Sequence, residues 1–263
     1  MTEIAKAFEH RKAFISFIVG GDPSLEVTEK LLPAMAQAGA DLIEIGLPFS
    51  DPVAEGTVIQ AGSERALQAG CTADKLFDTL ERTVPQLHVP VVLLTYLNPV
   101  LTYGKDKFMS RCKNCGISGL IVPDMPFEEK SELKSECARY GIEIISMIAP
   151  TSQERISMIA KDAQGFIYCV SSMGVTGVRD KITSDIGCMV NAAKSDAKIP
   201  VAVGFGISSP EQAAEISSIA DGVIVGSAIV QIVGQYGQNC IDPVCEYIRQ
   251  MKAAVSKSSL KPL

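Results

Sequence analysis

Residues 119–148 read GLIVPDMPFEEKSELKSECARYGIEIISMI, and this stretch contains one complete strand–helix–strand unit. Its two ends, residues 119–122 and 143–148, are short apolar runs, as expected for parallel strands that are covered on both faces. The middle is polar and longer than a strand. The stretch therefore predicts a pair of parallel strands joined by a helix.

The connecting segment, residues 128–140, has the pattern of an amphipathic helix. Leu133, Cys137 and Tyr140 recur at positions i, i+4 and i+7, and charged residues fill the other face. Pro126 stands where a first-turn proline would. The sequence therefore predicts a helix over residues 128–140 that packs one apolar stripe against the strands.

The same alternation of apolar runs and helical patterns continues in both directions along almost the whole chain. Eight such units in 263 residues predict a single (β/α)8 TIM barrel with extra short helices in the strand–helix loops. An open, doubly wound sheet would require a G-x-G-x-x-G turn after the first strand, and residues 18–22, IVGGD, do not match it. The predicted strands are residues 13–19, 41–45, 91–95, 119–122, 143–148, 166–170, 201–204 and 222–225.

Composition limits the kinds of partner. Hydrophobic residues make up 47% of the chain and charged residues 21%, which predicts a well-buried core. The net charge is −6 and no basic stripe stands out, so nucleic acid is not an expected partner. No apolar run approaches the roughly 20 residues needed to cross a bilayer, so no membrane association is expected.

The first twelve residues carry scattered charges and no apolar segment typical of a signal peptide. We therefore expect a cytoplasmic protein whose eight cysteines are thiols. Cys112 and Cys115 form a C-x-x-C pair, but no second pair or histidine cluster completes a metal site, and no metal is predicted. We interpret both residues as small buried hydrophobic groups at a helix end.

No linker rich in proline, glycine or serine divides the chain, so we expect one domain over residues 1–263. Residues 253–263 are polar and lack an apolar stripe, which predicts a frayed tail. In barrels of this kind the loops after the strands build the active site. His10 and His88 both precede strands and should lie at the opposite face, where a structural or surface role is favoured.

Carboxylates, in contrast, gather after the predicted strands: Asp22, Asp51, Glu55 and Asp124. Glu44 lies inside the second strand, where alternation places Leu42, Glu44 and Gly46 on one face. Burial without a partner raises the pKa of a carboxyl group toward the range that general acid–base catalysis needs. From the residues alone, catalysis and a buried structural ion pair remain equal alternatives for Glu44.

Three glycine-rich turns follow consecutive strands: residues 174–177 (GVTG), 204–207 (GFGI) and 226–229 (GSAI). Barrels often hold a phosphate between the loops after strands seven and eight and a helix N-terminus, where backbone N–H groups and the helix dipole face the anion. The turns therefore predict a phosphorylated substrate. The alternative is that the glycines only provide turns with positive φ.

Together these residues resemble the tryptophan synthase alpha chain family. The segment 44–56, EIGLPFSDPVAEG, is similar to the signature loop of that family, and four further segments match it in the same order along essentially the whole chain. They are residues 20–23 (GGDP), 174–177, 204–212 (GFGISSPEQ) and 226–229.

The resemblance implies a retro-aldol cleavage of indole-3-glycerol phosphate to indole and glyceraldehyde 3-phosphate. It implies Glu44 as the acid–base group that serves indole carbon 3 and the neighbouring hydroxyl, and Glu55 as the second acid, bonded to the indole N–H. It implies phosphate binding by Gly177, Gly206, Gly226 and Ser227. It also implies an indole pocket formed by Phe17, Leu94, Ile121, Tyr168 and Phe205.

Three positions depart from the common pattern of the family. Glu55 stands where the best-known members have Asp, which lengthens the reach of the second acid. Thr57 stands where Pro is common, which frees one φ angle in the loop after strand two. Ser172 stands where some members carry Arg. We expect these changes to affect rate and loop closure and not the fold.

The resemblance also implies a partner, a tryptophan synthase beta chain, in an α2β2 heterotetramer. Pyridoxal phosphate then belongs to the beta chain, and this chain needs no cofactor of its own. Asp51, Pro52 and Asn98 match positions on the docking face.

Alternatives to an active lyase subunit remain open. The altered second acid motivates a catalytically weak alpha chain that acts mainly as an allosteric activator of the beta chain. A stand-alone lyase that releases free indole, and an unrelated phosphosugar isomerase on the same barrel, are the other readings.

Overall fold

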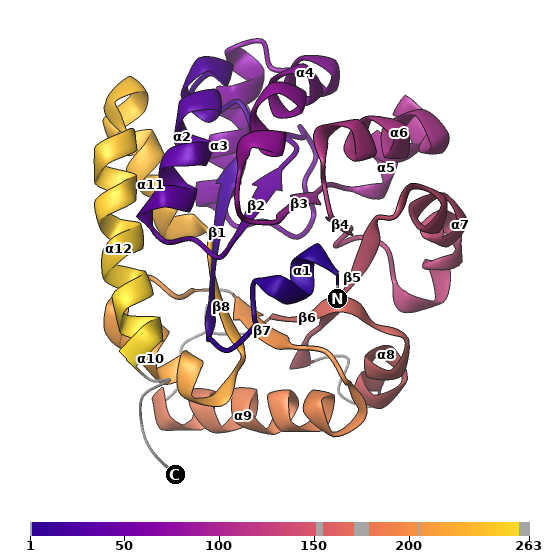
Figure 1. The fold of residues 1–263 in the computed structure, drawn as a ribbon, viewed down its shortest axis with the longest axis vertical. Coiled ribbons are helices and arrows are strands. Elements are labelled where there is room, and N and C mark those ends of the chain that lie inside the picture. Colours follow the sequence, from indigo (N-terminus) through magenta and orange to yellow (C-terminus); the bar gives the residue numbers. More distant parts are fainter. Residues whose placement is uncertain (1, 151–154, 171–178, 205, 258–263) are drawn as a thin grey trace.

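The computed structural model describes residues 2–150, 155–170, 179–204 and 206–257. Within these ranges eight parallel strands form a closed barrel in chain order, and β8 pairs with β1 (Figure 1). This confirms the predicted (β/α)8 barrel and excludes the open, doubly wound sheet. The strands are β1 (Ala13–Val19), β2 (Leu42–Gly46), β3 (Val91–Leu94), β4 (Gly119–Ile121), β5 (Glu143–Ile148), β6 (Gln164–Val170), β7 (Val201–Gly204) and β8 (Gly222–Val225).

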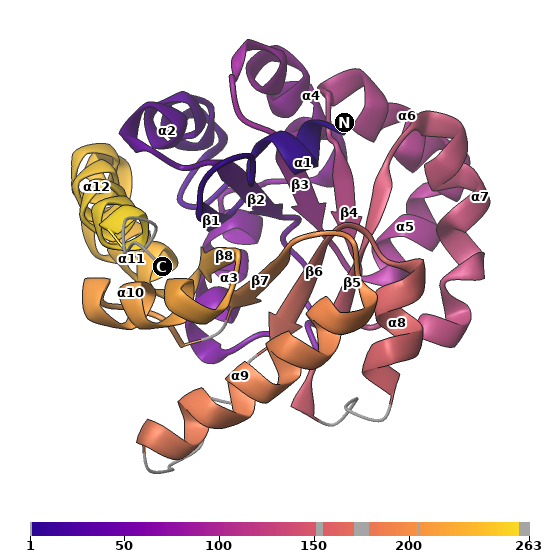
Figure 2. The same cartoon turned by 60° about the horizontal axis from the view of Figure 1, so that its bottom comes forward.

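Helices surround the barrel, and the last helix, α12, lies between α2 and α10, so that the C-terminal part of the chain closes the outer ring (Figure 2). The α-helices are α1 (Glu3–Lys6), α2 (Leu25–Ala38), α3 (Thr57–Gln68), α4 (Ala73–Thr83), α5 (Leu97–Tyr103), α6 (Lys105–Cys115), α7 (Ser131–Tyr140), α8 (Ile156–Asp162), α9 (Arg179–Asp196), α10 (Pro210–Ile219), α11 (Ser227–Tyr236) and α12 (Ile241–Lys257). Short 3₁₀ turns are η1 (Val84–Gln86), η2 (Phe127–Glu129) and η4 (Gly237–Asn239). The seven-residue α5, directly after β3, is one of the predicted extra helices.

The predicted strands agree with the observed ones to within two residues at each end. The predicted helix over residues 128–140 is wrong in its first turn, because η2 and α7 replace one continuous helix and Pro126 precedes the 3₁₀ turn. Lys130 separates the two. Its N–H donates to Phe127 O at 3.2 Å, and its buried Nζ donates to the backbone oxygen and the carboxylate of Asp162, both at 3.1 Å.

The predicted frayed tail is also partly wrong. Helix α12 continues to Lys257, and Val255 is fully buried in the core. The apolar residues Val244, Ile248, Met251 and Val255 recur at helical spacing, so the stripe of α12 extends beyond the position where the polar composition predicted its end. Residues 258–263 lie outside the described residues.

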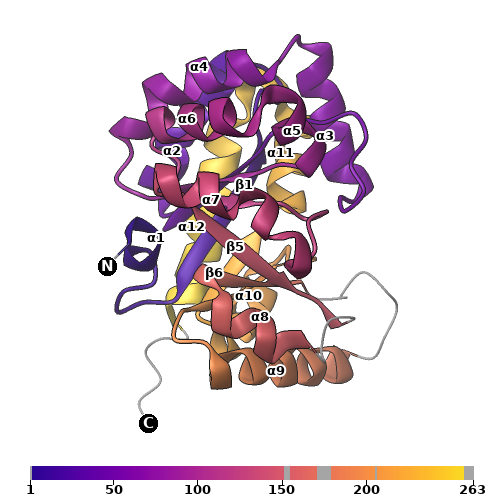
Figure 3. The same cartoon turned by 90° about the vertical axis from the view of Figure 1, so that its right-hand side faces the viewer.

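The amino-terminal end of the barrel is covered by α1, which lies across it on the side opposite the carboxyl ends of the strands (Figure 3). Ile4 of α1 is fully buried and reaches the backbone of two strands, since a Cβ added to Gly119 or Gly165 would meet its side chain at 2.8 or 3.3 Å. His10 and His88 precede β1 and β3 and lie toward this end, as predicted. The closed end leaves the carboxyl ends of the strands as the place for a site.

Candidate active site

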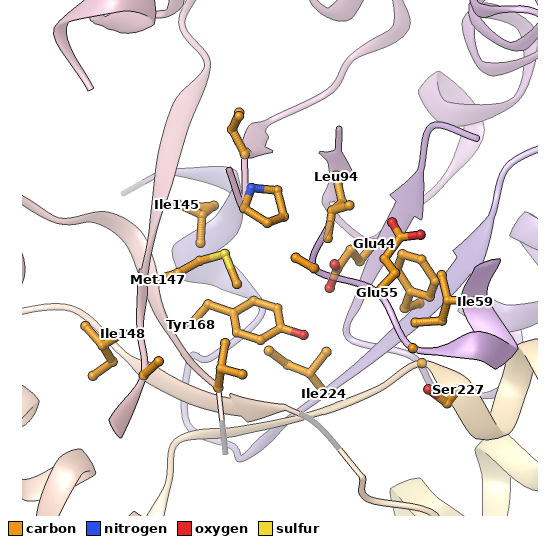
Figure 4. Close-up of a pocket in the computed structure, with 18 of the residues that line it drawn as sticks. Glu44, Glu55, Ile59, Leu94, Ile145, Met147, Ile148, Tyr168, Ile224 and Ser227 are labelled. Atoms are coloured by element: carbon orange, nitrogen blue, oxygen red, sulfur yellow. The ribbon is translucent and has the colours of Figure 1, made fainter. Parts of the chain in front are cut away.

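A cavity of about 800 Å³ lies at the carboxyl ends of the strands (Figure 4). Figure 4 shows Glu44 and Glu55 on one side of it, Ile145 and Met147 on the other, and the ring of Tyr168 between them. The volume suits a drug-sized organic molecule. The predicted site residues that line the cavity are Phe17, Glu44, Glu55, Leu94, Tyr168, Gly206, Gly226 and Ser227.

Glu44 points into the barrel from the middle of β2. Its side chain follows the inward register of the barrel, opposite Phe17 of β1, whereas Ile43 and Ile45 face outward to the helices. Only 1% of Glu44 is exposed, and its Oε2 has no hydrogen-bond partner among the described residues. Burial, and then the nearby charge of Glu55, raises the pKa of Glu44 to about 8.

A structural ion pair, the alternative reading of Glu44, is absent among the described residues, because no cation lies within salt-bridge distance of its carboxyl group. An unpaired carboxyl group in an apolar cavity is costly and remains protonated at neutral pH. The arrangement therefore provides a proton donor whose pKa lies close to physiological pH.

Glu55 enters the cavity from the irregular loop between β2 and α3. Burial raises the pKa of its carboxyl group, and a hydrogen bond from the Tyr96 hydroxyl opposes that rise. Its Oε2 is buried without a partner among the described residues. Two carboxyl groups thus face the same space, each with one oxygen free to bind a ligand.

The rest of the lining is mostly apolar, although Lys130, Arg155 and Gln231 also belong to it. Sequence reasoning identified Phe17, Leu94 and Tyr168 but missed other side chains that complete the wall: Ile59, Ile145, Met147 and Ile224. Alternation along the predicted strand 143–148 could have found Ile145 and Met147, since they lie two residues apart. Nothing local marks Ile59, which reaches the cavity from α3.

Ile121 is placed differently from the other predicted pocket residues. It pairs in register with Leu94 and is fully buried, but the cavity lining at β4 comes from the following residues, Val122 and Pro123. Phe205 and Gly177, which were predicted for the indole and phosphate ends, lie outside the described residues, as does Ser172.

The predicted phosphate end is formed by the turns after β7 and β8. Gly206 has φ of 73°, in the left-handed region that favours glycine. Gly226 precedes α11, whose first turn receives no side-chain cap, and Ser227 is the first residue of that helix. The N-terminus of α10, in contrast, is closed by a capping box of Ser209 and Gln212. Gly226, Ser227 and Ala228 line the cavity, so the uncapped N-terminus of α11 borders it.

Two other carboxylates that follow strands serve structural roles. The side chain of Asp22 is 2% exposed and accepts two hydrogen bonds from Arg65, at 2.8 and 2.7 Å. Asp124 accepts a hydrogen bond at 2.9 Å from the N–H of Leu97, the first residue of α5. Neither lines the cavity.

The residues predicted for the docking face are not among those that line the cavity. Asp51 and Asn98 are exposed, and Pro52 is partly exposed. They are accompanied by two exposed apolar side chains that sequence reasoning missed, Val53 at 78% and Leu101 at 48%. An exposed group of this kind, with apolar and polar residues together, is typical of a protein–protein contact.

The cysteines have the predicted character. All eight are free, and Cys112 and Cys115 are fully buried in α6. Burial raises the pKa of the Cys115 thiol to about 12, so it is a packed, unreactive group. Within the part of the chain that the structure describes, no cluster of three or more metal-binding side chains is present, and no helix is long and apolar enough to span a membrane.

Comparisons with known proteins agree on one family. The family model described as "Tryptophan synthase alpha chain" matches residues 4–256. A tryptophan synthase alpha chain of Lacticaseibacillus casei is 46% identical over 255 residues, which cover 97% of this chain and 96% of that protein. One of Lactiplantibacillus plantarum is 44% identical over 256 residues, 97% of each chain. The crystal structure of tryptophan synthase subunit alpha from Legionella pneumophila str. Paris has a TM-score of 0.88 at 32% identity, covering 98% of this chain and 99% of that one.

Proposed function

The chain belongs to the tryptophan synthase alpha chain family, and on this basis we propose that Glu44 and Glu55 are its two catalytic carboxyl groups. It is a carbon–carbon lyase of tryptophan biosynthesis that cleaves indole-3-glycerol phosphate to indole and glyceraldehyde 3-phosphate. The observation that carries the proposal is the pair of carboxyl groups, Glu44 buried and Glu55 partly buried, each with an unpartnered oxygen, on one side of a mostly apolar cavity.

The reaction begins with Glu44 protonated. Its pKa of about 8 keeps the proton on the carboxyl group at neutral pH, and it donates that proton to carbon 3 of the indole ring. The ring nitrogen then carries positive charge. Glu55, as a carboxylate, accepts a hydrogen bond from the N–H and stabilises this charge, which is worth more in a cavity that excludes water.

The carbon–carbon bond breaks in the second step. Glu44, now a carboxylate, removes the proton from the hydroxyl on the carbon attached to the ring. The O–H electron pair forms the carbonyl of glyceraldehyde 3-phosphate. The electron pair of the broken bond returns to the ring, restores its aromaticity and neutralises the nitrogen. Glu44 ends protonated again, now with the proton from the hydroxyl, and its first proton stays on carbon 3 of indole.

Substrate binding divides between the two ends of the cavity. Phe17, Leu94 and Tyr168 enclose the indole ring, together with Met147 and Ile59. Gly206, Gly226 and Ser227 hold the phosphate, aided by the uncapped N-terminus of α11. Gly177 and Phe205 are retained as proposed members of these two groups.

The gly-rich turn after β7 provides a test of phosphate binding. Gly206→Val puts a branched side chain at φ of 73° and in the path of the anion, so we expect KM and the dissociation constant of glycerol phosphate to rise by roughly tenfold, as when one hydrogen bond to a charged group is lost. Gly141→Val is the matched control, because Gly141 has φ of 72° at the end of α7 and an added Cβ there would meet no atom within 4 Å. Equal KM values for the two variants would contradict the assignment.

We further propose that a tryptophan synthase beta chain binds over Asp51, Pro52 and Asn98, with Val53 and Leu101 as apolar anchors, in an α2β2 heterotetramer. Apolar, exposed side chains at these positions support this. Pyridoxal phosphate belongs to the beta chain in this proposal, and the alpha chain needs no cofactor. Eight free thiols, seven of them buried, are in keeping with a cytoplasmic location.

The decisive experiment is to incubate the purified chain with indole-3-glycerol phosphate, with and without a beta chain, and to measure indole or tryptophan. We expect slow turnover alone and a rise of roughly 5- to 150-fold with the partner, the range of a typical allosteric coupling. No cleavage in either case, but a faster beta-chain reaction, would instead favour the second candidate, a regulatory subunit, for which Glu55 in place of Asp is the motivating observation.

A further inference from the structure

Tyr96 lies between the proposed docking face and the catalytic loop. It is the residue before α5, is 1% exposed, and does not line the cavity. Its ring packs on Phe49, with the ring centroids 5.5 Å apart. Phe49 belongs to the loop between β2 and α3, so a single buried side chain joins the end of β3 to the loop that carries Glu55.

The Tyr96 hydroxyl holds the backbone of that loop. It accepts a hydrogen bond at 3.1 Å from the N–H of Ala54, the residue before Glu55. The same hydroxyl also lowers the pKa of the Glu55 carboxyl group, against the effect of burial. One oxygen atom therefore fixes the backbone directly before Glu55 and favours the ionised form of its carboxyl group. On either side the loop is open: Val53 is 78% exposed, and a Cβ at Gly56 would meet nothing within 4 Å.

We infer that Tyr96 is a positioning residue for the cleavage reaction, which acts by holding the Glu55 carboxylate toward the indole nitrogen. The inference rests on the proposed role of Glu55. A glutamate side chain has one more rotatable bond than aspartate, so a longer acid on an open loop samples more positions unless a partner restrains it. The hydroxyl supplies that restraint without occupying the space needed by the substrate.

The electrostatic surroundings of Tyr96 keep its hydroxyl protonated, so that it can donate a hydrogen bond. Burial, together with the charges of Glu55 and Asp124, raises the pKa of Tyr96 to about 12. The phenol therefore stays protonated throughout the working pH range. Its hydrogen bond favours the charged form of Glu55, which is the form that stabilises a positive indole nitrogen.

The test compares four forms of the full chain: wild type, Tyr96→Phe, Glu55→Gln and the double variant. Tyr96→Phe keeps the ring that packs on Phe49 and removes only the hydroxyl. We expect kcat for indole formation to fall roughly tenfold, the cost of one hydrogen bond to a charged group. We also expect the acidic limb of the pH–rate profile to move to higher pH, because Glu55 loses the bond that favours its ionised form.

The double variant separates positioning from simple structural support. If Tyr96 acts through Glu55, the double variant is no slower than Glu55→Gln alone, since effects of residues that work as a unit are not additive. Tyr103→Phe is the matched control: Tyr103 lies in the same segment, at the end of α5, and its hydroxyl bonds Asp74, away from the cavity. It should leave kcat and the pH profile unchanged.

The outcomes distinguish the inference from the proposed function. A slow Glu55→Gln with a Tyr96→Phe variant that matches wild type in kcat and pH profile overturns the inference and leaves the role of Glu55 intact. If the double variant is slower than Glu55→Gln by the same factor by which Tyr96→Phe is slower than wild type, the two residues act independently. That result also overturns the inference. A Glu55→Gln variant with wild-type kcat overturns both.

Discussion

Glu44→Gln is expected to lower kcat for indole formation by about 10²- to 10⁴-fold, the usual contribution of a general acid–base group. The amide has the shape of the protonated carboxyl group, so the cavity remains filled, but it cannot give a proton to carbon 3 or take one from the hydroxyl. Binding of glycerol phosphate should be unchanged, because Glu44 is not among the proposed phosphate-binding residues and lies apart from Ser227 in Figure 4. Indole release measured at saturating substrate gives the rate.

The wild-type pH profile provides a second check of the same assignment. Since the first step needs protonated Glu44, kcat should fall as pH rises through about 8. A Glu44→Gln variant that keeps more than a tenth of wild-type kcat would show that another group moves the proton, and the catalytic role would have to be reassigned.

The same substitution is expected to stabilise the fold near neutral pH. In the unfolded chain the Glu44 carboxyl group ionises near 4.5, and in the folded chain near 8. Above pH 4.5 folding must therefore be accompanied by proton uptake, so Glu44 lowers the free energy of unfolding progressively up to pH 8. At pH 7, some 2.5 pH units above the lower value, this cost amounts to about 3 kcal/mol. Glutamine, which does not titrate, avoids it.

The measurement is the free energy of unfolding of wild type and Glu44→Gln in urea between pH 4 and 8. The free energy of unfolding of the variant should exceed that of wild type by an amount that grows with pH up to about 8. This excess should be smallest at pH 4, where Glu44 is mostly protonated in both the folded and the unfolded wild-type chain. Glu64→Gln, at an exposed carboxyl group on α3, is the matched control. A flat line for Glu44→Gln would mean that Glu44 is ionised in the folded chain at neutral pH.

The barrel could be predicted from the sequence because its strands are buried on both faces. Such strands are nearly continuous apolar runs, and runs such as Glu143–Ile148 and Val201–Gly204 were predicted residue for residue. The ends of the helices were harder to predict from the sequence. The break at Lys130 depends on Asp162, which is distant in sequence, and the extension of α12 depends on the burial of Val255. Contacts of this kind leave no local pattern.

In the site, too, residues with a local sequence pattern could be predicted, and contacts between distant segments could not. Glu44 was identifiable because a single acid within an apolar strand must be buried, and Glu55 because of its loop. Whether Glu44 had an ionic partner could not be predicted, since the counter-charge could come from any of the neighbouring strands. Tyr96 carried no signal at all: an aromatic residue after an apolar run is ordinary, and its contact with Ala54 exists only once the loop is folded.

The closure of β8 on β1 has a consequence for synthesis of the protein. Residues Ala13 to Ser16 pair with Gly222 to Val225. The first strand to be synthesised therefore has one unpaired edge until the last strand has been made. A growing or truncated chain that lacks β8 has unpaired strand edges and no Gly226 or Ser227 at the phosphate end. A chain that ends before β8 therefore lacks both the closed barrel and part of the proposed phosphate site, so we expect cleavage of the substrate only after synthesis has passed Ser227.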